Sequence, residues 1–189
     1  VWLNTEYPRF VMPRSILVTG FMLSAGLLAC TEDPTQLLVV VDSDMSVPQD
    51  LSGVKAEVRT LAGQVVGAID FSLVALEGPT SASTFHLPFS FGVLQPESGD
   101  VDQVIVQVSA IATSTAGAMP RSLFTRRAVT GFIQGKSLVL PMYLARLCQT
   151  LQCGTGETCT EKGCVSERVD ETALAESQGD DTDLVIVSV

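Results

Sequence analysis

The chain has 189 residues and a formal net charge of −10, and 46% of its residues are hydrophobic. This length allows one domain with a buried core, and the negative charge argues against nucleic acid or an anionic membrane surface as a partner. A single histidine and five cysteines leave few side chains for nucleophilic or metal chemistry.

The first feature along the chain is an apolar run that ends at Cys30 and gives way at once to polar residues. The run is shorter than the ~20 apolar residues that span a bilayer as a helix. It fits the apolar region of about 7–15 residues in a secretory signal, and Arg9 and Arg14 supply the preceding basic charge. We therefore expect residues 1–29 to be a helical signal peptide, with Met12 as a candidate for the true start.

The box Leu27-Leu28-Ala29-Cys30 resembles the lipobox of bacterial lipoprotein precursors. The resemblance implies that Cys30 carries a diacylglyceryl group after cleavage, that residues 30–35 form a lipidated tether, and that the lipid bilayer is a partner. Thr31 in place of Asp implies the outer membrane or cell surface of a Gram-negative bacterium. The alternative is an ordinary signal peptide with an incidental cysteine.

Residues 36–147 are predicted to be an all-β domain, because apolar residues alternate with polar ones in several runs. Val104, Val106 and Val108, for example, share one predicted face, with Gln107 on the other. We expect about seven strands in an antiparallel sandwich, immunoglobulin-like or related, with a small barrel as the alternative. The runs are 36–42, 54–61, 64–73, 84–93, 101–112, 123–133 and 137–146.

Two details qualify that prediction. Pro88 and Pro141 fall inside strand-like runs, which favours edges or bulges at these places. The resemblance to immunoglobulin domains is architectural only. Their Cys–Trp–Cys signature is missing, because the only tryptophan is Trp2.

Cys148, Cys153, Cys159 and Cys164 form a cluster within residues 148–164. In an exported protein such a cluster indicates disulfides, which replace the core that so short a segment cannot build. It is similar to EGF-like cysteine-rich knots, although an EGF domain needs six cysteines. Of the three pairings, we favour Cys148–Cys159 with Cys153–Cys164. The alternative is a Cys₄ zinc site, which generally uses tighter spacing.

Residues 165–189 are strongly acidic, with seven carboxylates and a single basic residue, Arg168. This composition predicts a solvated tail. The end of the segment, Leu184–Val189, is apolar and strand-like, and we expect that it could add to a sheet edge.

No catalytic motif stands out. His86, in a strand-like run, is expected to be an ordinary sheet residue, and no free cysteine or G-x-S-x-G motif offers a nucleophile. Asp42, Asp44 and Asp50 are weak calcium candidates, with residues of a turn after a strand as the favoured interpretation. No other metal or cofactor is expected.

Arg126 and Arg127 place two cations on opposite faces of one predicted strand. Either one of them points inward, where it would need a buried carboxylate, or the strand lies at an edge with both side chains solvated. We favour the edge.

Together these features predict a membrane-anchored envelope lipoprotein that is not an enzyme and acts as a binding, adhesion or scaffold module. Its partner at that module would be an envelope protein or glycan, and nucleic acid is not expected. The alternatives are a carbohydrate-active or hydrolytic envelope domain that uses carboxylates, and a peptidase-inhibitor-like protein with the disulfide loop as bait.

Overall fold

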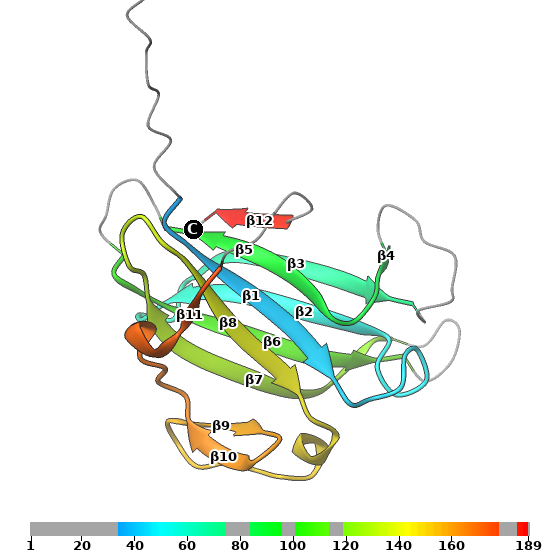
Figure 1. Ribbon diagram of the computed structural model, residues 1–189. Coiled ribbons are helices and arrows are strands. Elements are labelled where there is room, and N and C mark those ends of the chain that lie inside the picture. The colour runs from blue at the N-terminus through cyan, green and yellow to red at the C-terminus, as the bar shows by residue number, and fades with distance from the viewer. Residues whose placement is uncertain (1–33, 75–83, 96–100, 114–118, 178–184, 189) are drawn as a thin grey trace, which may run out of the picture. The chain divides into compact units, whose positions relative to one another are not determined.

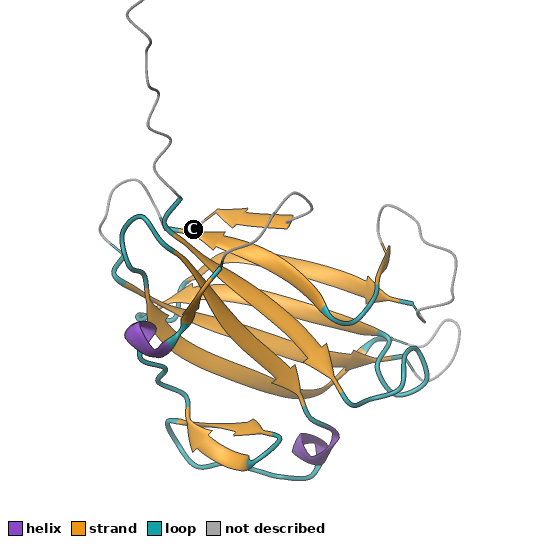
Figure 2. Ribbon diagram, viewed as in Figure 1, coloured by secondary structure: helices purple, strands orange, loops and turns teal. Residues whose placement is uncertain are grey.

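The computed structural model describes residues 34–74, 84–95, 101–113, 119–177 and 185–188. The predicted signal peptide and Cys30 lie outside these residues. Glu32–Val189 form one compact unit, in which two β-sheets pack face to face (Figure 1). The described secondary structure is β-strand apart from two short 3₁₀ helices (Figure 2). The prediction of an all-β sandwich with a disulfide-rich module is confirmed.

The first sheet has the strand order β11-β8-β1-β5-β12. Its central strand, β1, runs antiparallel to β5 and parallel to β8, and β12 runs parallel to β5. The expectation that the apolar segment 184–189 adds to a sheet edge is confirmed for β12. The bounds are β1 (Gln36–Ser43), β5 (Phe89–Leu94), β8 (Ser137–Leu144), β11 (Ala175–Glu176) and β12 (Val185–Ser188).

The second sheet has the order β4-β3-β2-β6-β7 and is antiparallel except where β4 runs parallel to β3. The sandwich is therefore mixed. The prediction of an antiparallel sandwich is wrong on this point, because alternation of side chains along a strand does not report the direction of its neighbours. The bounds are β2 (Gly53–Thr60), β3 (Val65–Leu73), β4 (Thr84–Phe85), β6 (Gln103–Ala112) and β7 (Arg121–Gly131).

The connectivity differs from that of an immunoglobulin domain. In the constant-type arrangement the first, second, fourth and fifth strands share one sheet, so the second and third strands lie in different sheets. Here β2 and β3 form a hairpin within the second sheet, while β1 pairs with β5 and β8 in the first. The fold is therefore a related sandwich rather than an immunoglobulin-like one.

The core between the sheets follows the predicted alternation. Val104, Val106 and Val108 have no exposed surface, whereas Gln107 on the other side of β6 is half-buried. At the heart of the core, Phe71 packs against three other aromatic rings, with centroids 4.5 to 5.5 Å away: Phe85, Phe89 and Phe91. Burial of a side chain of this kind contributes about 1.5–3 kcal/mol, so these residues account for much of the stability.

The two prolines lie where the main-chain ladder is incomplete. The predicted run 84–93 is two strands, β4 and β5, and Pro88 lies in the break between them. Pro141 is exposed within β8, at a point beyond the two residues that pair with β11. The expectation of an edge is confirmed at Pro141, where β8 has no neighbour beyond β11 among the described residues, because proline has no N–H to donate. At Pro88 the predicted strand is interrupted by a connection instead of carrying an edge or a bulge.

Residues 165–177, the part of the acidic segment nearest the module, are not the free tail that the composition predicts. The Val129 N–H donates to the Glu167 carbonyl at 2.7 Å, and the Val169 N–H donates to the Val129 carbonyl at 2.9 Å. Leu174 packs against the main core, and β11 pairs with β8. Main-chain hydrogen bonds thus hold residues 167–177 on the sandwich, although many of the side chains stay exposed and acidic.

Candidate functional site

The most distinctive part of the molecule is the disulfide module, which follows β8 directly (Figure 1). It consists of a 3₁₀ helix, η1 (Arg146–Gln149), and a two-stranded hairpin, β9 (Glu157–Thr160) with β10 (Gly163–Ser166). Gly163 has a φ of 101°, a left-handed conformation that suits glycine in the tight turn. The Thr160 hydroxyl donates to the Gly163 carbonyl at 3.0 Å and helps to close this turn.

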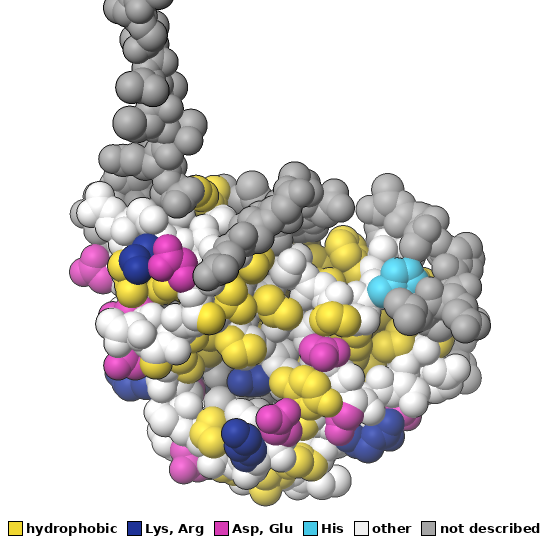
Figure 3. Space-filling model, viewed as in Figure 1, with side chains coloured by type: hydrophobic (Ala, Val, Ile, Leu, Met, Phe, Trp, Pro, Cys, Tyr) yellow, Lys and Arg dark blue, Asp and Glu magenta, His cyan; other side chains and the backbone are white. Residues whose placement is uncertain are grey.

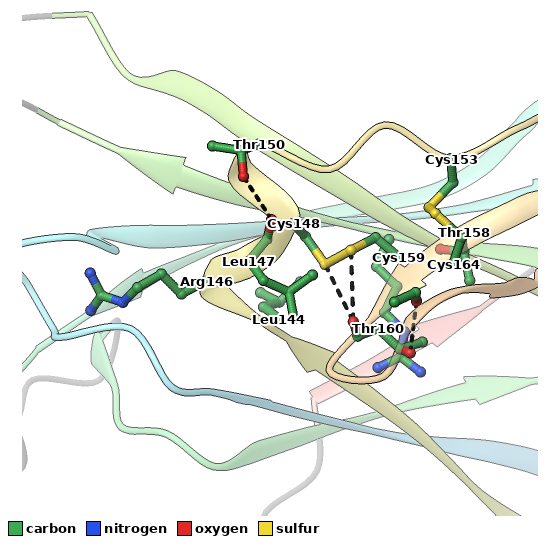
Figure 4. The surroundings of a disulfide bond; sticks show 12 residues. Leu144, Arg146, Leu147, Cys148, Thr150, Cys153, Thr158, Cys159, Thr160 and Cys164 are labelled. Atoms are coloured by element: carbon green, nitrogen blue, oxygen red, sulfur yellow. Dashed lines mark hydrogen bonds between the residues drawn. A yellow bond between two sulfur atoms is a disulfide. The ribbon is translucent and has the colours of Figure 1, made fainter.

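Two disulfides tie the module together, and their pairing confirms the favoured prediction (Figure 4). We call Cys148–Cys159 the inner bridge, because these residues are only 3% and 7% exposed. We call Cys153–Cys164 the outer bridge, because Cys164 is exposed. All four sulfurs are committed to disulfides, so the zinc alternative does not describe this cluster.

The inner bridge belongs to a small core that is separate from the main one. Buried Ala145 joins the two bridge cysteines, and the half-buried rings of Phe124 and Tyr143 pack against them. Phe124 comes from β7 and Tyr143 from β8. The module is therefore packed onto the sandwich as well as covalently closed.

Acidic side chains of the β1–β2 connection hold the base of the module. The Arg146 main-chain N–H donates to Asp44 Oδ1 at 2.6 Å, and Arg146 Nη2 donates to Asp50 Oδ2 at 2.7 Å. The side-chain hydrogen bond from Arg146 lowers the pKa of Asp50 below its ordinary value. Sequence reasoning missed the role of Arg146, because its partners lie about a hundred residues earlier in the chain.

The three aspartates considered for calcium are used differently. Asp42 Oδ1 accepts a hydrogen bond from the Ser43 N–H, as in the predicted turn after a strand, while Asp44 and Asp50 bind Arg146. Across the described residues, no group of three or more histidine, cysteine or acidic side chains is placed to hold a metal ion. The contacts agree with the favoured interpretation for Asp42, a turn after a strand, and give Asp44 and Asp50 the role of holding an arginine.

The module and the segment after it cover the free edge of β7. The Arg127 N–H donates to the Thr158 hydroxyl at 2.9 Å, and the Arg127 guanidinium lies 3.5 Å from the Glu167 carboxylate. Further along β7, the Val129 N–H donates a hydrogen bond to the Glu167 carbonyl. An exposed strand edge invites pairing with other chains, and the module protects this one.

Arg126, on the other face of β7, is half-buried and reaches toward β8 of the first sheet rather than into solvent. Its Nη1 donates to the Tyr143 carbonyl at 3.0 Å, and its buried Nε has no hydrogen-bond partner. Burial lowers the pKa of Arg126, while the charge of Glu161 acts in the opposite direction. The edge position of β7 was predicted correctly, but solvation of both arginines was wrong, because Arg126 shares the inner face of β7 with buried Ala128 and binds a carbonyl of the opposite sheet in place of the carboxylate expected for an inward cation.

His86 lies between β4 and β5 and is half-buried. Its Nδ1 is 3.2 Å from the Val74 carbonyl oxygen. This contact anchors the ring to a neighbouring loop, and the expectation of a sheet residue is wrong in that His86 lies in the connection between two strands.

The outer faces of the two sheets differ in chemistry. On the first sheet, every second residue of β1 and β8 faces outward, and several of these residues are apolar, including Val40, Val139 and Pro141. Figure 3 shows hydrophobic side chains gathered on this face. On the second sheet, Glu57 pairs with both Lys55 and Arg59. These two hydrogen-bonded cations lower the pKa of Glu57.

A cavity of about 770 Å³ lies at the end of the sandwich where β1 begins. Asp102, at the start of β6, and Glu171, in the short helix η2 (Glu171–Ala173), both line it. The volume falls within the usual range for small-ligand sites, about 300–1,000 Å³. Its other lining residues are Thr60, Leu61, Ala62, Gln95, Val101, Gln103 and Phe132.

Comparison with protein-family models, with curated proteins and with solved structures found no match to this chain. Within the part of the chain that the structure describes, no helix is long and apolar enough to cross a membrane. Inferences about function therefore depend on the residues and the geometry of the chain itself.

Proposed function

We propose that this chain is a lipid-anchored, non-catalytic envelope protein that presents its disulfide module to a partner. The lipobox-like Leu27-Leu28-Ala29-Cys30 supports the anchor, and two disulfides fit an oxidising compartment outside the cytoplasm. The bilayer is the partner of Cys30, at the outer membrane or cell surface, and an envelope protein or glycan is the partner of the module.

One observation carries the proposal. β1 and β8 are parallel and in register, with Gln36 opposite Ser137 and Ser43 opposite Leu144. The chain that follows Cys30 therefore enters the sandwich at one end, and the module leaves it at the other. An eight-residue strand spans about 25 Å, so the fold separates the module from Gln36, where the described chain enters the sandwich, by about that distance.

The anchor is tested by metabolic labelling with a fatty acid. We expect label on the protein and on a Cys164→Ser variant, and none on Cys30→Ser, because only the lipobox sulfur carries the thioether. The Cys164 variant is the matched control, since it makes the same change at an exposed cysteine. An unmodified mature N-terminus beyond residue 30 would refute the anchor.

The orientation is tested with a fluorophore at one of two exposed positions on the lipidated protein in vesicles that contain a quencher lipid. Gln134 lies in the turn at the entry end, and Lys162 lies in the turn of the module. We expect stronger quenching for a label on Gln134→Cys than on Lys162→Cys. Equal quenching at the two positions would contradict the proposed display.

The cavity lined by Asp102 and Glu171 favours a second candidate, a carbohydrate-active or hydrolytic domain, because glycosidases use a pair of carboxylates. Asp102→Asn and Glu171→Gln would each abolish activity on envelope glycans if this candidate were correct. The first proposal expects no such activity in the unchanged protein.

A further inference from the structure

The edge of β5 is covered by a strand that reaches it from the opposite side of the same sheet. β11 lies at one edge of the first sheet and β12 at the other, and only residues 177–184 join them. β12 pairs with β5 in parallel register, Val185 opposite Phe91 through Ser188 opposite Leu94 (Figure 1). The outer main-chain groups of β5 therefore have a dedicated partner in this short segment.

β5 is held in place independently of that partner. Its inner edge pairs with β1 along its whole length, and Phe89, Phe91 and Val93 are buried in the main core. The edge that β12 occupies therefore has supports in the fold other than β12 itself. An edge of this kind is a template for another extended chain.

The pairing of β12 depends on four residues and on a parallel ladder. Parallel pairing is slightly less stable per residue than antiparallel pairing, and main-chain hydrogen bonds are the same whichever copy of the chain supplies the strand. Three aspartates, at positions 180, 181 and 183, precede the apolar Leu-Val-Ile-Val sequence. Charges beside an apolar strand act against uncontrolled aggregation and leave pairing at a matching edge open.

We propose that the β5 edge is a strand-binding site, filled by β12 of the same chain and able to take residues 185–188 of a second copy in the same register. β12 of the same chain has a higher effective concentration at this edge than residues 185–188 of a second copy, so the monomeric arrangement prevails in dilute solution. At high local concentration two copies exchange strands, which is the low-cost route to a dimer that identical elements provide. This inference does not depend on the proposed anchor.

Cross-linking tests the exchange directly in the unit Glu32–Val189, which contains both sheets and both disulfides. Copies with Leu94→Cys are mixed with copies with Ser188→Cys, since these positions are partners in the register. We expect a disulfide between positions 94 and 188 of different copies, identified by mass spectrometry and increasing with protein concentration. The matched control replaces Leu94→Cys by Leu61→Cys, on an exposed turn. A yield no higher than that of the control would overturn the proposal.

A second measurement uses a variant that ends at Ser177 and a labelled peptide of residues 183–189. We expect the peptide to bind the shortened variant. Its affinity for the unchanged unit should be lower by at least about tenfold, because β12 of that unit competes for the same edge. Peptides with Val185→Pro or Ile186→Pro sharpen the test. On an edge strand only alternate N–H groups face the neighbour, so one proline peptide should lose binding and the other should keep it. Absence of binding by the unchanged peptide, or equal binding by both proline peptides, would refute a strand ladder.

Discussion

Val106 offers the most direct test of how the sandwich is built. It lies on β6 between β2 and β7, has no exposed surface, and stands opposite Val58 and Ala128, which are both buried. Val106→Asp removes about 1.5–3 kcal/mol of apolar burial. It also buries a carboxylate among apolar neighbours, at a cost of several kcal/mol. Because a domain of this size is stable by about 5–15 kcal/mol, we expect the variant to be largely unfolded.

The next residue provides the control. Gln107 is half-buried on the outer face, between Glu57 and Arg127 on the neighbouring strands. A carboxylate there faces one cation and one anion in contact with solvent, so Gln107→Asp should cost less than about 1 kcal/mol. Urea unfolding followed by far-UV circular dichroism measures both variants, since the only tryptophan, Trp2, lies outside the described sheets.

The comparison tests strand register as well as burial. A slip of one residue exchanges the inner and outer faces of a strand. If Gln107→Asp lowered the urea midpoint more than Val106→Asp, β6 would have to face the core with its other side, and the register of the second sheet would be wrong.

Three further predictions concern the module and its attachment. Replacing both cysteines of the inner bridge by alanine should lower the melting temperature more than the same change in the outer bridge, because only the inner one is packed in a core; equal losses would contradict this. The Asp50–Arg146 contact should stabilise the fold above the ordinary carboxyl pKa of 3.8, and its contribution should fade as the pH falls through the lowered pKa of Asp50. The difference in melting temperature between the unchanged protein and Asp50→Asn should therefore shrink as the pH is lowered below 3.8, and a difference that stayed constant throughout the acid range would show that ionisation of Asp50 does not matter. Arg126→Met should leave the melting temperature unchanged or raise it, since a half-buried cation whose buried Nε has no hydrogen-bond partner is costly. A clear fall would show that the hydrogen bond to the Tyr143 carbonyl outweighs desolvation.

The strands were predictable because the chemistry that defines them is local. Valines two residues apart, as at Val104, Val106 and Val108, require one buried face whatever strands lie beside them. The disulfide pairing also followed the favoured prediction, in a segment too short to hold a core without covalent closure.

Strand partners were less accessible, because they join distant parts of the chain. Nothing in the local pattern shows that Gln36 lies opposite Ser137, or that β1 and β8 run in the same direction. The same limit applies to Asp50 and Arg146, whose contact spans 96 positions of sequence. Each residue alone is consistent with a solvated surface charge.

The acidic segment was mispredicted for a different reason. Composition averages over a whole segment, and residues 165–189 are on average polar enough to stay in solution. Two main-chain hydrogen bonds at Val129 and the packing of Leu174 act at single positions that an average cannot report. The misassignment of Arg126 is related, because its partner, the Tyr143 carbonyl, lies on a different strand that local alternation cannot identify.

The parallel alignment of β1 and β8 also has a mechanical consequence. A pull on the chain before Gln36, resisted at the module after Leu144, draws the two strands in opposite directions along their length. The ladder between them extends over eight register pairs, with the evenly spaced bonds of a parallel pair. The force is then shared among these bonds at once instead of opening them one after another. The central strand pair thus resists tension in shear along the line that joins the chain's entry to its disulfide module.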